Sequence, residues 1–139
     1  MKIHIEKNAF TLIEIMLVVI IIGALAAMVI PRLSGRSEQA KIVVAKADIE
    51  TLLATALKLY ELDNGGFPTT SQGLEALVQK PSSSPIPVNW NGPYLERKPV
   101  DPWGNPYIYE SPGQHRLDYD LYSSGKDSKS ESDNIDNWE

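Results

Sequence analysis

The chain has 139 residues, of which 22% are charged and 42% hydrophobic; this suffices for one modest domain and excludes collagen-like, coiled-coil-only and fully disordered classes. It has no cysteine, so a thiolate nucleophile, a cysteine-ligated metal and any disulfide are excluded. The net charge of -5 resides in residues 118–139, which contain seven carboxylates and two lysines. The remainder is neutral, so no basic surface for nucleic acid is expected.

The first predicted element is an apolar helix at residues 10–30, whose only charged residue is Glu14. It is long enough to span a bilayer, and Lys2 and Lys7 before it favour a cytoplasmic leader. One interpretation is a secretory signal peptide cleaved near residues 24–26, and another is an uncleaved anchor. Both leave Glu14 unexplained, because a carboxylate inside an apolar span costs about 2.5 to 3.5 kcal/mol.

A third interpretation comes from residues 7–14, with the sequence KNAFTLIE. They resemble the processing site of type IV prepilins and of the pseudopilins of type II secretion. The resemblance implies that a prepilin peptidase cleaves between Ala9 and Phe10 and methylates the new amine of Phe10. Glu14 would then pair with the Phe10 ammonium of a neighbouring subunit. This family usually has glycine before the cut, so Ala9 implies slower processing.

An amphipathic helix is predicted after the apolar segment, with no strong stop before Asn64-Gly65-Gly66, so one helix is expected from Phe10 to about Asp63. Its predicted apolar stripe consists of Ile42, Ala45, Ile49, Leu52, Leu53, Ala56, Leu57 and Tyr60. Pro31 removes a backbone hydrogen bond at a cost of about 3 kcal/mol, and Gly23 weakens the same region. This weak point is either a simple kink at the membrane exit or, as in the related filaments, a segment that unwinds during assembly.

The remaining residues predict a small α+β head on the long helix. Thr69 and Gln72 have the spacing of a capping box before a short helix with an apolar face of Leu74, Leu77 and Val78. Residues 81–87 are a proline- and serine-rich loop, and residues 101–106 are a turn. Three antiparallel strands are expected at residues 94–97, 107–109 and 117–122.

Several head motifs resemble the major pseudopilins of type II secretion over nearly the whole chain. They are Asn64-Gly65, Pro68-Thr69-Thr70, QGLEAL at residues 72–77, DPWGNPY at residues 101–107 and the C-terminal segment at residues 133–138. The resemblance implies a type IV pilin-like fold, with a long N-terminal helix packed on a small antiparallel sheet and a C-terminal calcium loop. Many type IV pilins carry a C-terminal cysteine pair, which this chain lacks.

The C-terminal loop, residues 123–138, is rich in oxygen-bearing side chains and has little to bury before its terminal tryptophan. Oxygen ligands suit Ca²⁺, whereas the absence of cysteine and of a histidine pair disfavours zinc or copper. The spacing after Asp127 is not that of an EF-hand. Composition alone is equally consistent with a solvated acidic tail.

The resemblance implies a single structural Ca²⁺ in this loop. The implied ligands are side chains of Asp127, Ser132, Asp133 and Asn134, with backbone carbonyls of Ser124 and Lys129. The loop is slightly shorter before Asp133 than the family pattern, and Asn134 stands where a second aspartate is common. Asp136 is the obvious substitute ligand.

No catalytic arrangement is visible: His4 lies in the leader, His115 lies in a Gly-Gln-His loop, and Ser123 and Ser124 have no base beside them. A structural protein rather than an enzyme is therefore expected. The resemblance implies a cleaved leader at residues 1–9, a membrane or filament-core helix at residues 10–35 and a periplasmic head at residues 36–139.

The implied function is a homopolymer that leaves the inner membrane and grows as a helical periplasmic filament, driving folded proteins across the outer membrane. Implied partners are minor pseudopilins, the inner-membrane assembly platform and prepilin peptidase, and no nucleic acid. One alternative is a type IV pilin of a surface fibre used in adhesion, motility or DNA uptake. Another is a monomeric, membrane-anchored calcium-binding domain.

Overall fold

The structure, a computed structural model, describes residues 10–138, apart from the side chains of residues 30–34. The chain divides into two compact units, one up to Glu38 and the other from Gln39 onward. The elements in chain order are α1 (Leu12–Ala47), η1 (Asp48–Leu53), α2 (Ala54–Asn64), η2 (Gly73–Leu77), β1 (Ile108–Glu110), β2 (Asp120–Ser123), η3 (Glu131–Asp133) and β3 (Ile135–Asp136). Helix α1, Leu12–Ala47, is assigned across the boundary between the two units.

The first unit contains the apolar part of α1. Leu12–Val29 is long and apolar enough to cross a membrane, and none of this segment is buried within the chain. Its large apolar side chains, together with Phe10, are between 46% and 80% exposed. The helix assignment runs through Gly23 and Pro31 without a break. The unwinding of this segment during assembly stays a prediction.

The second unit begins with the end of α1, followed by a π-helical turn η1, Asp48–Leu53, and by α2, Ala54–Asn64. The helix ends at Gly65, whose φ of 79° is left-handed and whose amide donates to the Glu61 carbonyl at 2.7 Å. Glycine adopts this conformation without the steric cost that a Cβ imposes, which explains the stop. The predicted extent of the helix, to about Asp63, is confirmed.

Of the eight predicted stripe residues, six are buried, Ile42 is half-buried and Leu52 is exposed. The buried members are Ala45, Ile49, Leu53, Ala56, Leu57 and Tyr60. Leu52 is 51% exposed, which contradicts the prediction. The π-helical turn η1 has i to i+5 spacing, so it shifts the phase of the stripe and places Leu53 rather than Leu52 in the core.

The predicted short helix is present as the 3₁₀ helix η2, Gly73–Leu77. Its capping box is formed as expected: the Thr69 amide donates to Gln72 Oε1 at 3.1 Å, and the Gln72 amide donates to Thr69 Oγ1 at 3.3 Å. Leu74 and Leu77 are buried. Residues 81–87 have no helix or strand, as predicted.

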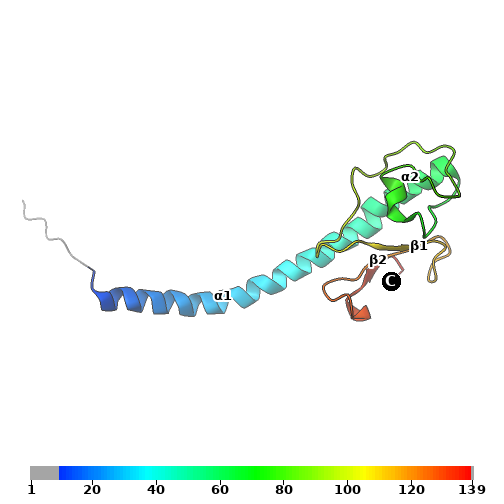
Figure 1. Cartoon of the computed structure of the whole chain (residues 1–139). Coiled ribbons are helices and arrows are strands. Elements are labelled where there is room, and N and C mark those ends of the chain that lie inside the picture. The colour runs from blue at the N-terminus through cyan, green and yellow to red at the C-terminus, as the bar shows by residue number, and fades with distance from the viewer. Residues whose placement is uncertain (1–9, 139) are drawn as a thin grey trace, which may run out of the picture. The chain divides into compact units, whose positions relative to one another are not determined.

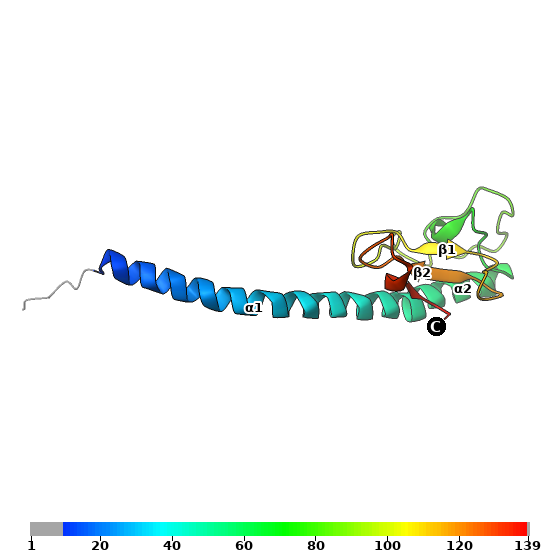
Figure 2. The ribbon, with the colours of Figure 1, turned by 90° about the horizontal axis from the view of Figure 1, so that it is seen from below.

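The sheet has three antiparallel strands in the order β1, Ile108–Glu110, β2, Asp120–Ser123, and β3, Ile135–Asp136. Tyr109 pairs with Leu121 between β1 and β2, and Tyr122 pairs with Asp136 between β2 and β3. Strands β1 and β2 run alongside the helical segment that includes α2 (Figures 1 and 2). The α+β architecture with a three-stranded sheet is therefore confirmed.

The identity of the strands was predicted less well. Residues 94–97 form bends instead of a strand, because the amides of Tyr94 and Leu95 both donate to the Leu77 carbonyl, at 2.7 and 3.0 Å. The strand predicted at residues 117–122 begins only at Asp120, since the preceding residues turn around that side chain. The third strand is β3, which lies in the segment expected to be an irregular loop.

The turn at residues 101–106 is confirmed. Asp101 organises it: its Oδ1 accepts the amides of Trp103 at 3.0 Å and Asn105 at 2.8 Å, and its carbonyl accepts the amide of Gly104 at 2.9 Å. Asp101 is itself buried.

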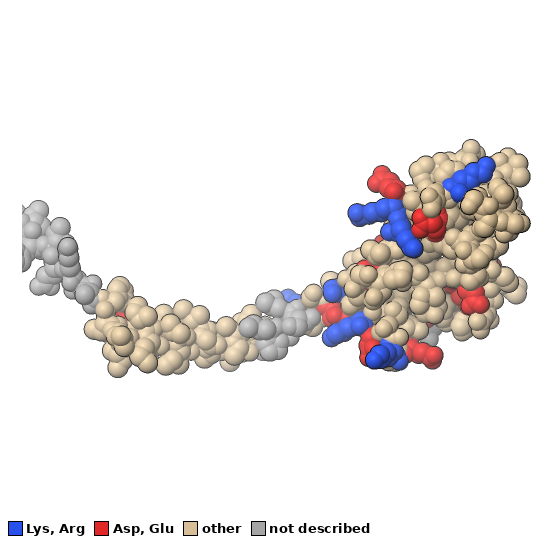
Figure 3. Space-filling view, viewed as in Figure 1, with Lys and Arg blue, Asp and Glu red and all other residues tan. Residues whose placement is uncertain are grey.

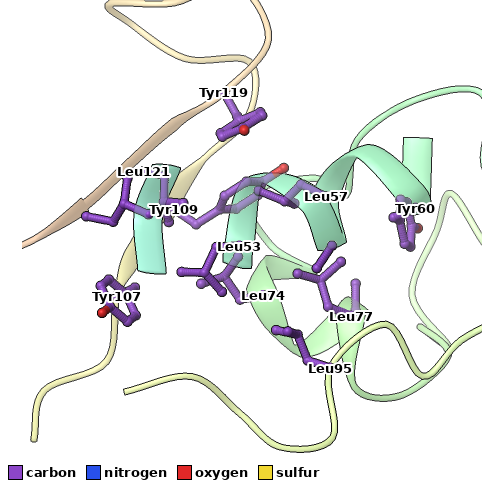
Figure 4. Packing of buried hydrophobic residues seen from close by; sticks show 13 residues of the cluster. Leu53, Leu57, Tyr60, Leu74, Leu77, Leu95, Tyr107, Tyr109, Tyr119 and Leu121 are labelled. Atoms are coloured by element: carbon purple, nitrogen blue, oxygen red, sulfur yellow. The ribbon is translucent and has the colours of Figure 1, made fainter. Parts of the chain in front are cut away.

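The core of the second unit is built from three sources (Figure 4). Leu53 and Leu57 come from the helix, Leu74 and Leu77 come from η2, and the sheet region supplies Tyr109, Tyr119 and Leu121. Acidic and basic side chains are interspersed over the face of the head in Figure 3, whereas the apolar part of α1 is almost free of them.

Candidate functional site

The N-terminus of α1 holds Glu14 in a capping box with Thr11. The Thr11 amide lies 3.4 Å from Glu14 Oε2, and the Glu14 amide donates to Thr11 Oγ1 at 3.3 Å. A carboxylate is favoured there by the exposed amides of the first turn. The signal for this box, threonine followed three residues later by glutamate, is present in the sequence, although no role was predicted for Thr11.

The other predicted assembly positions are less informative. Phe10 is 76% exposed, whereas Ala9, and with it the cleavage site, lies outside the described residues. An added Cβ at Gly23 would meet no described atom within 4 Å. Packing within a single chain therefore does not require glycine at this position.

The C-terminal loop leaves the sheet at a buried polar joint. Ser123 Oγ donates to Asp101 Oδ2 at 2.6 Å and accepts the Gly125 amide at 3.0 Å. Gly125 has a φ of 65°, and a Cβ there would collide with the carbonyl oxygen of Asp133. The absence of a side chain at residue 125 thus lets the outgoing and returning limbs of the loop approach closely.

Hydrogen bonds within the loop involve several predicted ligands. Asp127 Oδ1 accepts the Lys129 amide at 3.0 Å, and its carbonyl accepts the Ser130 amide at 3.0 Å. Ser132 Oγ lies 2.7 Å from Ser130 Oγ and 3.4 Å from Asp133 Oδ1. The structure therefore brings Ser132 and Asp133 together on the helical turn η3, Glu131–Asp133, while Asp127 lies in the preceding turn.

The remaining candidates lie nearer the sheet. Ser124 is buried beside the joint, and Asn134 lines a cavity of about 390 Å³ with Glu110, His115 and Trp138. Asp136 Oδ1 accepts the Trp138 amide at 3.1 Å. Within residues 10–138 no group of three or more His, Asp or Glu side chains is placed to hold a metal.

The return limb is fastened to β2 by residues that sequence analysis missed. The Asn137 side chain accepts the Leu121 amide at 3.0 Å and donates to the Tyr119 carbonyl at 3.1 Å. Trp138 stacks on His115, with ring centroids 4.1 Å apart and planes within 6°. No local pattern could have revealed this pair, because its members are distant in sequence.

Asp120 fixes the turn that carries His115. Its carboxylate accepts the amides of Gln114, His115 and Arg116 at 2.8, 2.9 and 3.0 Å, and it lies 2.9 Å from His115 Nδ1. Burial opposes ionisation of Asp120, but these hydrogen bonds outweigh it and lower its pKa to about 2.

An exposed apolar N-terminal helix and a small α+β head, in one chain, define a pilin-like subunit. The family model for type II secretion system (T2SS) protein G matches residues 32–138. The chain belongs to this family.

The similar proteins agree with this assignment. Type II secretion system core protein G of Pseudomonas aeruginosa is 54% identical over 139 residues, covering 96% of each chain. The Escherichia coli K12 protein of the same name is 47% identical over 135 residues, covering 96% of this chain and 92% of the relative. The crystal structure of the major pseudopilin from the type 2 secretion system of enterohaemorrhagic Escherichia coli matches with a TM-score of 0.67 and 40% identity, covering 78% of this chain and 95% of that one.

These findings bear out the secretion interpretation of the sequence and not the surface-fibre alternative. The family is one of structural pseudopilin subunits. Within residues 10–138, Leu12–Val29 is the one helical segment long and apolar enough to cross a membrane, which fits a single-pass anchor.

Proposed function

We propose that this chain is a structural subunit that polymerises into the periplasmic pseudopilus of the type II secretion system, and that filament growth drives folded proteins across the outer membrane. The observation that carries the proposal is the exposure of every large apolar side chain between Leu12 and Val29. Such a surface is stable only in lipid or against other apolar surfaces. Repetition of one contact by a screw operation would supply those surfaces in a filament.

The proposed life of the subunit begins in the inner membrane, with α1 as a single span and the head in the periplasm. Prepilin peptidase would remove residues 1–9 and methylate Phe10, and the assembly platform and minor pseudopilins would start the filament. A cut before Phe10 leaves the new ammonium close in sequence to Glu14. A neighbour's ammonium would then compete with Thr11 for this carboxylate.

Substitutions at Glu14 test this assembly step. Glu14→Gln preserves the capping box, since glutamine serves there as well as glutamate, but it removes the charge. Glu14→Leu removes both. If charge pairing drives assembly, both variants insert normally and give far fewer sheared filaments than wild type, with Ile13→Leu as the matched control.

Retention of wild-type filament yield in Glu14→Gln would assign Glu14 to capping alone. Wild-type yield in both variants would contradict any assembly role for the carboxylate.

We further propose that the loop at residues 124–134 binds Ca²⁺ through oxygens of Asp127, Ser132, Asp133 and Asn134 and the carbonyls of Ser124 and Lys129. The donor set of carboxylate, hydroxyl, amide and carbonyl oxygens fits a hard cation. The close approach of Gly125 to Asp133, which a Cβ would block, brings the two donor-bearing limbs together. Bound Ca²⁺ would offset the repulsion between the carboxylates and join these limbs.

Thermal unfolding of the full chain in detergent tests this proposal in Ca²⁺, Mg²⁺ and chelator. A ligand that binds only the folded state stabilises it by about 2.7 kcal/mol at a hundredfold excess over Kd. Mg²⁺ should substitute poorly because it requires tighter octahedral coordination. Asp127→Ala should abolish the Ca²⁺ response and Asp133→Ala should weaken it, whereas Glu131→Ala, which removes an exposed carboxylate of the same loop, should retain it.

If Asp136 substitutes for Asn134 as a ligand, Asp136→Ala should also weaken the Ca²⁺ response of the melting temperature. Equal melting temperatures for the wild-type chain in Ca²⁺ and in chelator would contradict the calcium proposal and leave the filament proposal intact.

A further inference from the structure

The strand pairing at the base of the C-terminal loop is very short. β2 and β3 are joined only by the pairs Tyr122 with Asp136 and Ser123 with Ile135. Beyond them, Asn137 extends the ladder: its amide donates to the Leu121 carbonyl at 3.1 Å and its side chain bonds two β2-side backbone groups. The Asn137 carbonyl also accepts Arg116 at 3.1 Å.

The stack of His115 and Trp138 closes the same end of the loop. The Asp120 carboxylate accepts the His115 amide at 2.9 Å and lies 2.9 Å from His115 Nδ1, which orients the imidazole against Trp138. Trp138 lies parallel to it and makes an edge contact with Tyr122 at 5.6 Å. We call Asn137, Trp138 and His115 the C-terminal clamp.

The clamp and the Ser123 joint hold opposite limbs of the loop. The outgoing limb, with Ser124 and Asp127, is fixed where Ser123 donates to buried Asp101. The returning limb, with residues 132–134, is held on its C-terminal side. There Ile135 pairs with Ser123 and packs against the core, and the clamp follows. Binding a cation between two limbs is costly if either limb must be ordered at the same time.

We propose that the C-terminal clamp positions the returning limb for cation binding, so that His115 and Trp138 determine the calcium affinity of the loop without touching the ion. This inference rests on the calcium proposal above. Supporting groups around a metal site, when removed, typically weaken affinity by about 10-fold to 100-fold. Linkage is reciprocal, so Ca²⁺ must also strengthen the clamp.

Calorimetric titration of the detergent-solubilised full chain with CaCl₂ tests the proposal. His115→Ala and Trp138→Leu each remove the stack, and each should raise the Kd by roughly tenfold or more. His115→Phe retains a flat ring against Trp138 and should restore most of the affinity. Leu117→Ala, at a side chain that is 99% exposed in the same turn region, is the matched control and should bind as wild type does.

Hydrogen exchange gives a second readout. In the wild type, Ca²⁺ should slow exchange of the Leu121 and Asn137 amides, and this slowing should be lost in Trp138→Leu. Exchange at the core helix in chelator shows whether each variant is folded, and if His115→Ala is not, Trp138→Leu carries the test.

Unchanged Ca²⁺ affinity in a folded stack-breaking variant would overturn the role of the clamp and leave the calcium proposal standing. Failure of the wild type to bind Ca²⁺ would overturn both.

Discussion

The two halves of the helical segment differ in how their apolar side chains are covered. In Leu12–Val29 every large apolar side chain is exposed, and none of the segment is buried within the chain. Between Ala45 and Tyr60 one stripe is buried almost completely, while charged residues such as Lys46 and Glu50 remain outside. The apolar face of the head helix is therefore covered by residues of the same chain, whereas the apolar surface of the N-terminal helix requires lipid or other subunits to cover it.

Because of this difference, substitutions that affect the stability of the head should be distinct from those that affect filament assembly. Substitutions in the buried stripe should alter the free energy of unfolding of the head, because the stripe contacts η2 and the strands. Substitutions in the apolar segment should leave that free energy unchanged and alter insertion or filament yield instead.

The largest expected contrast is between Leu57→Ala and Ile20→Ala. Leu57 is 0% exposed in the head core and Ile20 is 64% exposed in α1. Leu57→Ala should lower the free energy of unfolding by about 2 to 5 kcal/mol, measured by urea denaturation in detergent. Ile20→Ala should change it by less than about 0.5 kcal/mol. A similar loss in both variants would contradict the separation.

Acid should weaken the head through Asp120. Its pKa of about 2 in the folded state lies below the ordinary value of 3.8, so its contribution is complete above about pH 4 and is lost as the pH falls toward 2. Wild-type stability should fall over this range by about 2 kcal/mol more than that of Asp120→Asn, in urea titrations at each pH. Parallel pH profiles for the two proteins would count against this role.

A smaller effect is expected at the capping box of η2. Thr69→Ala removes the hydroxyl that accepts the Gln72 amide and should lower stability by about 1 kcal/mol. Thr69→Ser retains the hydroxyl and should remain near wild type. Equal losses in the two variants would show that packing of the methyl group, rather than capping, matters at this position.

The helix, the capping box and the turn at residues 101–106 could be predicted because each depends on local spacing. The periodicity that identified the stripe failed at Leu52, where a π-helical turn inserts a phase shift that no local residue pattern reports. Gly65 indicated the end of the helix because glycine adopts the left-handed conformation of a helix cap without steric cost.

The strands and the C-terminal clamp depend on distant partners. Tyr94 and Leu95 have strand character, but the Leu77 carbonyl takes both of their amides. Strand β3 has only two residues, Ile135 and Asp136, within a polar segment, so no alternating pattern marks it. It pairs with β2 where Ile135 packs against the core and Asn137 bonds to the Leu121 backbone. The calcium ligands were implied by family resemblance rather than by the residues alone, which is why they stay a proposal.

The most direct test of the account is the intact mass of the subunit in sheared filaments from cells that express the complete secretion system. If the chain is a processed pseudopilus subunit, it is recovered in filaments with the mass of residues 10–139 plus one methyl group. Absence of the chain from filaments, or a mass that retains Met1 to Ala9 or begins after Ala26, would contradict the account.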